Sequence, residues 1–374
     1  MTAFKFELWN LGTTKLAEFN PSGARWDMNI KDASGSLTFT VPQGDVPPEL
    51  DVGLVDVLIA QDGAYVWRGQ VLGRQFTVEG ASFQQQFTAV GLFELLADRY
   101  IPAGTSYTAA SVNIALTIIS DVQLQTNGAI ITGQTIGQDG AQSKYNGLDL
   151  YFTYPDTVIT KNYDQPTSVK QAVEELSGIY PFDIQMHPIP SGKYGITGGN
   201  TGTAVPHFVA IPRGSDTDAP TVTLAHGNQV SRITGVDNLA PGGPFCNQAD
   251  VYPNGGGVPT TRSDATLMGT HRRRDKVLTS TGGNDYADTL IGIATTTLWD
   301  GKPRTMPTVT VRPGVNLIEL GDNVHLFSEQ VPEVNGRWLV AGRSVTWPTM
   351  DDPDTFQQEL TLEPYNPRTV DPFA

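Results

Sequence analysis

The chain has 374 residues, 39 Gly, 26 Pro, 17% charged residues and a net charge of −15. This length allows about two or three domains, and the composition favours short strands and turns over long helices. The acidic balance argues against a surface that binds nucleic acid or an anionic membrane, and the lone Cys246 excludes an intrachain disulfide.

The first hundred residues predict antiparallel strands. Segment 4–8 alternates in polarity and places Glu7 opposite the apolar face, and segment 36–42 repeats the alternation. Asp62-Gly63 and Glu79-Gly80 predict hairpin turns. Because an open sheet of about five or six strands leaves unpaired edges, a small closed barrel is expected here.

Helical spacing begins after Gly91. A short helix is expected over 91–102, ended by Pro102, and a second helix follows with Thr108 as its N-cap. A passage rich in Gly, Gln and Asn from 128 to 147 reads as loop and weak strand.

The helix after Pro166 has the clearest signals. Ser168 and Gln171 have the spacing of a capping box, and Gly178 marks the end. A hairpin with its turn at Ser191-Gly192 is expected next.

Strands return between 220 and 278, and a further helix is expected at about 284–299 with Asn284 as its cap. Strands then continue to about 364. The buried side of this helix is expected to carry residues at helical spacing: Ala287, Leu290, Ile291, Ala294 and Leu298.

Two distant strand pairs share a motif. Gly73-Arg74, followed by Phe83-Gln84-Gln85 and Thr88, has a counterpart in Gly342-Arg343, followed by Phe356-Gln357-Gln358 and Thr361. Chance likeness between β strands rich in Thr, Val and Gln is one explanation. The other is a duplicated β unit, and three such chains would place six similar units around an axis.

These patterns predict a mainly β protein with an α+β insertion. Two similar tube-like antiparallel β-barrels are expected at 1–98 and 218–366, with an inserted α/β module at 99–217 and a loose tail at 367–374.

In order and spacing, several motifs together resemble the baseplate hub or tail-tip proteins of tailed bacteriophages, the minor tail proteins of siphophages. The segments that carry the resemblance are 26–42, 87–101, 168–184, 285–299 and 320–363.

The resemblance implies a homotrimer placed below the sixfold tail tube and the distal tail protein. Such a hub surrounds the end of the tape-measure protein, bridges to a central fibre or spike and opens for DNA passage. It implies a place in the virion tail tip after assembly in the host cytoplasm, with no sequence-specific nucleic-acid binding and no stable membrane insertion. Because the sequence ends at Ala374, soon after the closing strands, receptor binding and wall digestion are expected to belong to other proteins.

Candidate chemistry is sparse. Cys246 has no basic neighbour in sequence, and the adjacent Glu174 and Glu175 point apart on a helix. The histidines are scattered without metal-site spacing: His187, His207, His226, His271 and His325. No catalytic, cofactor-binding or metal-binding residue and no cofactor are therefore predicted, and binding residues are left unassigned.

Three charged segments remain open. The acidic turns 214–220 and 350–354 are either solvated linkers or Ca²⁺ ligands. The basic segment 271–276 is either an exposed loop or a contact for an acidic neighbouring subunit.

Two other functions compete with the hub. A carbohydrate-binding tail adhesin would use Trp299, Trp338 and Trp347 as stacking faces, although core packing explains them equally well. A cell-wall hydrolase would need a carboxylate pair or a metal triad, and the sequence offers neither.

Overall fold

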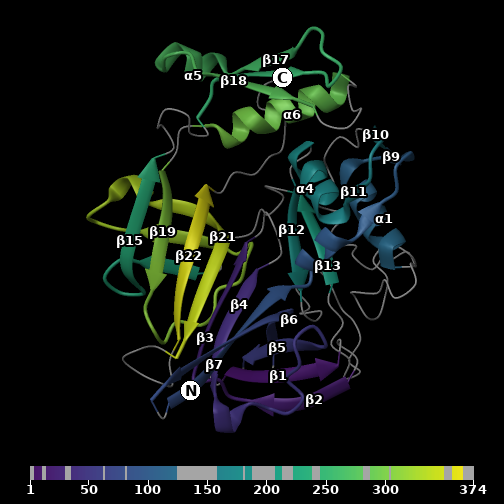
Figure 1. Ribbon diagram of the computed structural model, residues 1–374. Helices are drawn as coiled ribbons and strands as arrows, with labels where there is room; N and C mark the ends of the chain where they lie inside the picture. Colours follow the sequence, from purple (N-terminus) through teal and green to yellow (C-terminus); the bar gives the residue numbers. More distant parts are fainter. Residues whose placement is uncertain are drawn as a thin grey trace.

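The computed structural model describes residues 4–10, 14–29, 35–61, 64–80, 82–123, 158–179, 182–187, 207–212, 222–237, 245–280, 287–302, 305–348 and 356–364. Strands prevail in this part of the chain, as the sequence predicts, and the largest sheet has 13 strands. Figure 1 shows this sheet at the bottom and left, the helical module at the right, and a smaller layer at the top.

Unit 1, the first part of the large sheet, has the strand order β3-β4-β7-β6-β5-β1-β2. Both predicted hairpins form, since Gln61 pairs with Ala64 and Glu79 pairs with Ser82. A 3-10 turn, η1 (Gln43–Asp45), follows the fourth strand. The strands are β1 (Phe4–Asn10), β2 (Thr14–Phe19), β3 (Gly23–Asn29), β4 (Ser36–Pro42), β5 (Val55–Gln61), β6 (Ala64–Glu79) and β7 (Ser82–Gly91).

Unit 2, the second part, has the order β15-β19-β22-β21, with β20 paired to β21 and β14 paired parallel to β20. Strand β3 of unit 1 pairs with β21 and so joins the two units into one sheet. The described pairs leave this sheet open, and closure into barrels stays a prediction. The elements are β14 (Val222–Ala225), β15 (Val230–Asp237), β19 (Thr305–Val311), β20 (Asn323–Phe327), η4 (Pro332–Val334), β21 (Gly336–Trp347) and β22 (Gln357–Pro364).

The helical module packs α1 against α4 and the short η2 around one apolar core. Two small antiparallel pairs, β9–β10 and β8–β11, border it, and β12 pairs with β13. Its elements are η2 (Glu94–Asp98), β8 (Tyr100–Ile101), β9 (Thr105–Ala109), α1 (Ser111–Gln123), β10 (Ile159–Tyr163), β11 (Thr167–Ser168), α4 (Val169–Ile179), β12 (Phe182–His187) and β13 (His207–Pro212).

The first two helix predictions in this module need correction. The expected helix over 91–102 is only the 3-10 turn η2. Thr108 caps no helix, because it lies in β9 and its hydroxyl lies 3.0 Å from that of Thr160 on β10. Strand pairing thus uses the residue that the sequence offered as an N-cap, and α1 starts at Ser111.

The prediction for α4 largely holds. The Ser168 hydroxyl accepts a hydrogen bond from the Gln171 N–H at 3.2 Å, which is the N-terminal half of a capping box. The Gln171 side chain instead donates to Glu175 at 2.9 Å, and the helix ends at Ile179 rather than at Gly178.

The hairpin predicted after α4 has a different second strand. The turn expected at Ser191-Gly192 lies outside the described residues, and β12 pairs with β13, so that His187 faces His207 in register. Strand β12 ends at His187, and the next residue in the sequence is a proline, which cannot donate to a strand ladder.

A separate layer interrupts unit 2 in sequence. Strand β16 lies between β17 and β18, and α6 packs on this sheet through Leu290, Ala294 and Leu298. Ala287, expected on the buried side of α6, is exposed, and Asn284 lies outside the described residues. The elements are β16 (Gln248–Tyr252), β17 (Thr260–Ser263), α5 (Ala265–Thr270), β18 (Asp275–Thr279) and α6 (Ala287–Asp300).

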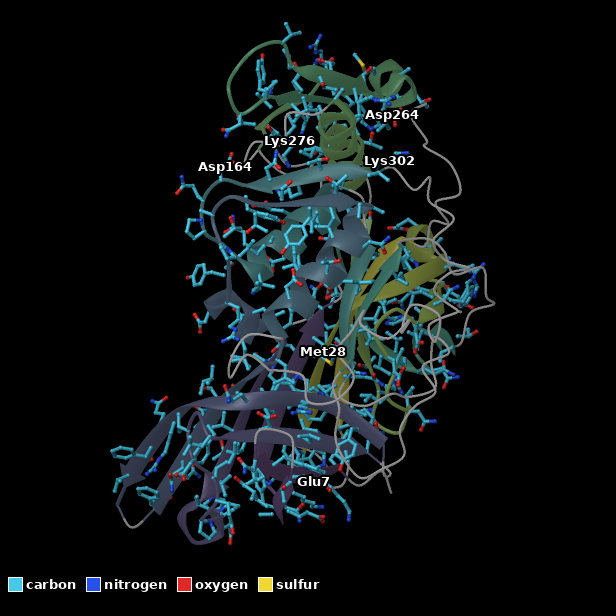
Figure 2. The ribbon with its side chains drawn as sticks, turned by 90° about the vertical axis from the view of Figure 1, so that its right-hand side faces the viewer. Glu7, Met28, Asp164, Asp264, Lys276 and Lys302 are labelled. Carbon is cyan, nitrogen blue, oxygen red and sulfur yellow. The ribbon has the colours of Figure 1, made fainter. Side chains whose placement is uncertain are left out.

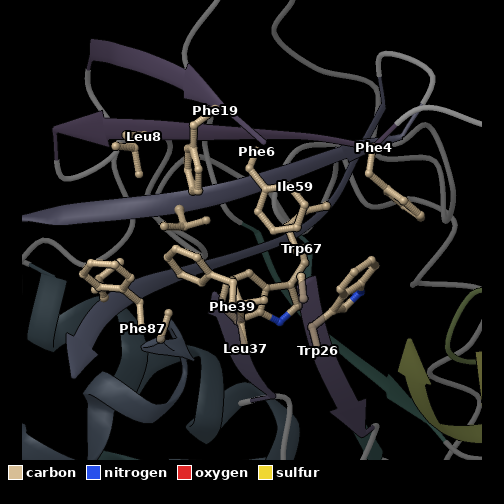
Figure 3. Packing of buried hydrophobic residues seen from close by; sticks show 14 of the residues in the cluster. Phe4, Phe6, Leu8, Phe19, Trp26, Leu37, Phe39, Ile59, Trp67 and Phe87 are labelled. Atoms are coloured by element: carbon tan, nitrogen blue, oxygen red, sulfur yellow. The ribbon is translucent and has the colours of Figure 1, made fainter. Parts of the chain in front are cut away.

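An aromatic core fills unit 1, and Figure 3 shows its rings gathered between the strands. Phe4 and Phe6 lie on the predicted apolar face of β1, with the Phe6 ring 5.8 Å from that of Phe19 between centroids. Unit 2 contributes Val345 and Phe356 to the same core. The two units therefore share apolar packing as well as a strand pair.

Candidate assembly interface

The two β units repeat each other in strand register. Gly73 pairs with Thr88 across β6 and β7, and Gly342 pairs with Thr361 across β21 and β22. In both hairpins a one-residue irregularity lies just before the glycine, between Val71 and Gly73 and between Val340 and Gly342. The motif that the sequence repeats thus marks the same place in two equivalent hairpins, which argues against chance likeness.

The correspondence extends to the neighbouring strands. Thr88 also pairs with Thr38 on β4, just as Thr361 pairs with Thr308 on β19. On β4 and β19 the next residue along each strand, Phe39 or Val309, is fully buried. Strand β4 therefore corresponds to β19, β7 to β22 and β6 to β21.

A polar pair is repeated as well. Asp56 of β5 accepts from Arg68 of β6, with 2.6 Å between Oδ2 and Nη2, and both side chains are buried. At the equivalent place in unit 2, the Arg337 Nε donates to Asn323 of β20 at 3.5 Å. Strand β5 thus corresponds to β20, with the aspartate replaced by its neutral isostere.

Close packing explains why both copies of the motif carry a glycine and a threonine. A Cβ atom on Gly73 would lie 2.1 Å from the Thr88 Oγ1, and one on Gly342 would lie 3.2 Å from the Thr361 Cβ. A larger residue at Gly73 would force the Thr88 side chain to move, and β-branched side chains rotate little. The close approach of each glycine to its threonine is therefore repeated at both bulges.

The junction between the units buries the tip of the β21–β22 hairpin. Val345 is fully buried opposite Trp26 of β3, and the Phe356 ring stands edge-on to Phe4 at 5.2 Å between centroids. Large apolar side chains of unit 2 thus complete the core of unit 1, which stabilises the joint by hydrophobic burial.

Arg343 is also buried at this junction. Its Nη1 donates to the Ile318 carbonyl at 2.9 Å, and its Nη2 lies 3.4 Å from the Met28 sulfur. Burial lowers the pKa of Arg343 to about 10, although the charges of Glu319 and Asp322 oppose that shift. Figure 2 shows Met28 between the strands of the two units.

The equivalent hairpin tip of unit 1 is exposed. Phe76 and Val78 correspond to Val345 and Trp347, yet they are 61% and 63% exposed. The Phe76 and Phe83 rings stack on each other at 6.2 Å. The β6–β7 tip is thus an apolar projection whose counterpart in the same chain lies inside a core.

Several edges of the large sheet are open among the described strands: β2 pairs only with β1, β14 only with β20, and two further open edges belong to β6 and β15. The part of β6 beyond Gly73 pairs with β7 on one side only, and β15 pairs only with β19. Exposed edges of this kind are ready templates for pairing with another chain.

A buried carboxylate lies on β1, next to the edge strand β2. Glu7, expected on the polar face of β1, is buried and accepts from Trp9 at 3.0 Å and from Tyr65 and Lys15. Burial alone would raise the pKa of Glu7, but these hydrogen bonds together lower it below its ordinary value of 4.5. A lone acidic residue in an alternating strand gives no sign of this arrangement.

The candidate chemical residues do not converge. Buried Cys246 lies 3.6 Å from the Thr297 carbonyl, as expected for a structural thiol. Glu174 and Glu175 bind different lysines, Lys170 and Lys161. Within the described residues no group of His, Cys, Asp or Glu is arranged to hold a metal ion, and no helix there is long and apolar enough to cross a membrane.

The histidines are dispersed in the fold, except that His187 and His207 occupy paired backbone positions of β12 and β13. The other three lie in separate segments: His226 after β14, His271 after α5 and His325 within β20.

The other candidate segments are partly accounted for. Both acidic turns, 214–220 and 350–354, lie outside the described residues. In the basic segment, the Arg273 Nε donates to Asp275 at 2.7 Å, and the Arg274 guanidinium lies 5.2 Å from the centre of the Phe245 ring. These two arginines therefore have partners in their own chain.

Two of the three tryptophans proposed as sugar platforms serve the core. The Trp338 indole is buried and donates to the Val334 carbonyl at 2.8 Å. Trp347 stacks on Phe6 at 5.9 Å in the core of unit 1. The side chain of Trp299 lies outside the described residues. No stacking surface for sugar forms from Trp338 and Trp347.

Comparison with known proteins found similarity at the level of structure. No family model matches the chain, and no curated protein matches its sequence. A tail protein from Neisseria meningitidis MC58 has a TM-score of 0.64 at 14% identity, and the match covers 98% of each chain. The 43 kDa tail protein of prophage MuSo2 from Shewanella oneidensis has a TM-score of 0.61 at 12% identity, covering 96% of this chain and 97% of that one.

A third similar structure comes from a type VI secretion system. This E. coli protein, itself similar to the bacteriophage T4 tail proteins gp27 and gp5, has a TM-score of 0.52 at 9% identity. The match covers 96% of this chain and 77% of the E. coli chain. Over almost its whole length, the chain therefore has the fold of phage tail proteins.

Proposed function

We propose that the chain is a structural subunit of a phage tail tip, and that three copies form the baseplate hub. The repeated β unit is the observation that carries this proposal. Two units in one chain, joined through β3 and β21, let three chains present six similar units. A trimer built this way matches a sixfold tail tube without needing six chains.

The partners follow from that position. The hub would meet the distal tail protein on the tube side and a central fibre or spike on the other, and it would surround the end of the tape-measure protein. The net charge of −15 suits a channel through which DNA passes, because like charge discourages adhesion. The role is one of assembly and opening, with no chemical step, and its place is the virion.

Copy number and position test the proposal. Purified tails that contain this chain should carry three copies each, counted by quantitative mass spectrometry against the six-copy rings of the tail tube. Antibodies raised against the chain should label the distal end in electron micrographs. Six copies, labelling along the tube, or absence from tails would refute the hub.

A further inference from the structure

The repeat has one asymmetry. The β21–β22 tip of unit 2 pairs with β3 of unit 1, whereas the equivalent stretch of β6 beyond Gly73 pairs with no described strand other than β7. Strand β15 occupies in unit 2 the position of β3 in unit 1, because β15 pairs with β19 as β3 pairs with β4. Within one chain, β15 is the first strand of the path, and β19, β22, β21, β3, β4 and β7 lie between it and β6.

We infer that β15 of one chain pairs with the open edge of β6 in the next copy, in the register of the β3–β21 junction. The contact is head-to-tail, so it repeats from copy to copy and closes only as a ring. That the ring contains three copies rests on the proposed hub function, but the strand pairing and its register rest on the structure of a single chain.

The register follows from the internal correspondence. In the junction, Trp347 pairs with Ala24, Thr346 with Arg25 and Val345 with Trp26. The bulge glycines align Trp347, Thr346 and Val345 with Val78, Thr77 and Phe76. The pairs with β4 and β19 align Ala24, Arg25 and Trp26 with Ile233, Thr234 and Gly235. Across chains, Val78 therefore lies opposite Ile233, Thr77 opposite Thr234 and Phe76 opposite Gly235.

The side chains fit this register. At the junction the large Trp26 meets the smaller Val345, and at the new interface the large Phe76 meets Gly235, which has no side chain. Large and small residues are thus exchanged between the two strands, and an aromatic ring over a cross-strand glycine is a favourable arrangement. Ile233 is partly buried against the unit 2 core, and so offers Val78 an apolar neighbour.

Burial supports the same conclusion. Val345 and Arg343 are 0% and 5% exposed under β3, whereas their counterparts Phe76 and Arg74 are exposed. Long edges that carry exposed apolar residues invite pairing, and proteins usually cover or charge them. The junction between β3 and β21 shows that a strand of this chain can pair with an edge of this kind. A second copy of the chain is therefore the partner we infer for the open edge of β6.

Paired cysteines test the register. Directly opposite residues in antiparallel strands have Cα atoms about 4.5–5.5 Å apart, which a disulfide spans. The variant T77C/T234C should form interchain disulfides on mild oxidation and give covalent species of two and three chains on non-reducing gels. T77C/R232C shifts the register by two residues and should give about tenfold less product. The equivalent pair T346C/R25C should form its disulfide within one chain and serves as the positive control.

The experiment is run on the purified full chain and on tails assembled from it, with the buried Cys246 left in place. Equal yields from the two interchain pairs, or none from T77C/T234C in both samples, would overturn the inference. If tails hold three copies but T77C/T234C does not cross-link, the result supports the trimeric hub and refutes the strand pairing. Cross-linked rings of another size would leave the pairing intact and refute the trimer.

A second variant avoids dependence on cysteine chemistry. Phe76→Asp places a charge on an exposed side chain, so the fold of the chain should survive while self-association weakens at least tenfold. Val258→Asp is the matched control, since Val258 is exposed in the separate layer and should leave association unchanged. Sedimentation velocity over a concentration series measures both, and equal association of F76D and the parent chain would contradict the interface.

Discussion

Truncating the two equivalent phenylalanines is expected to affect the folded chain unequally. Phe356 is buried in the core of unit 1, and its ring lies edge-on to Phe4 at 5.2 Å. Phe83, its counterpart on β7, is only half-buried and stacks on the exposed Phe76. The same substitution therefore probes a core position and an uncovered one.

The magnitudes follow from burial. Removing a buried Phe side chain costs about 3–5 kcal/mol, which includes the cavity left behind. Phe83→Ala removes one aromatic contact and a partly solvated ring, for which about 1 kcal/mol is expected. Phe356→Ala should therefore destabilise the monomer by roughly 2–4 kcal/mol more than Phe83→Ala.

Urea unfolding followed by tryptophan fluorescence measures the difference, at concentrations where sedimentation shows a monomer. Phe83→Ala should also weaken self-association, because Phe83 stacks on Phe76 at the exposed tip. The self-association of Phe356→Ala is compared only under conditions in which that variant is folded. Equal losses of unfolding free energy in the two variants would refute the reasoning, because it would mean that the two hairpin tips are equally packed within one chain.

Three further outcomes are expected. The pKa of the hydrogen-bonded Glu7 is lowered, so Glu7 stabilises the fold above its ordinary pKa of 4.5, and this contribution is lost as the pH falls below that value. In Glu7→Gln the free energy of unfolding should therefore change less with pH on the acid side, and parallel pH profiles for the two proteins would contradict this. Asp56→Ala removes the carboxylate partner of buried Arg68 and should cost about 3–5 kcal/mol in urea unfolding, whereas Asp56→Asn, which copies the equivalent pair in unit 2, should cost clearly less. Ser168→Ala should cost about 1 kcal/mol by loss of the N-cap bond and speed hydrogen exchange in the first turn of α4, and unchanged exchange there would argue against capping.

The sequence by itself determined the local elements and the repeat. Alternation identified β1 and β4, turn dipeptides placed the β5–β6 and β6–β7 hairpins, and Ser168 marked the start of α4. These signals are readable because they depend on residues close in sequence. The repeated motif also aligned Gly73 with Gly342, since each glycine meets a threonine at the same bulge.

Other features could not be predicted because the deciding partner is far along the chain. Thr108 is a residue type that often caps a helix, yet it lies in β9 because that strand pairs with β10. Glu7 occurs in an ordinary alternating pattern, and only the approach of Tyr65 and Lys15 buries and satisfies it. The layer that contains β16 and α6 has strand patterns like those of unit 2, so sequence placed it in the same region.

The junction itself was decided only by tertiary structure. Nothing local in β3 or β21 indicates that Trp26 pairs with Val345, because strands present the same backbone groups to any edge and register depends on which apolar faces fit together. The covered tip at Phe356 and the uncovered tip at Phe76 differ for that reason alone. The two similar sequences form similar hairpins. The β21–β22 tip is buried because β3 lies beside it, and the β6–β7 tip is exposed because β6 pairs there with no described strand other than β7.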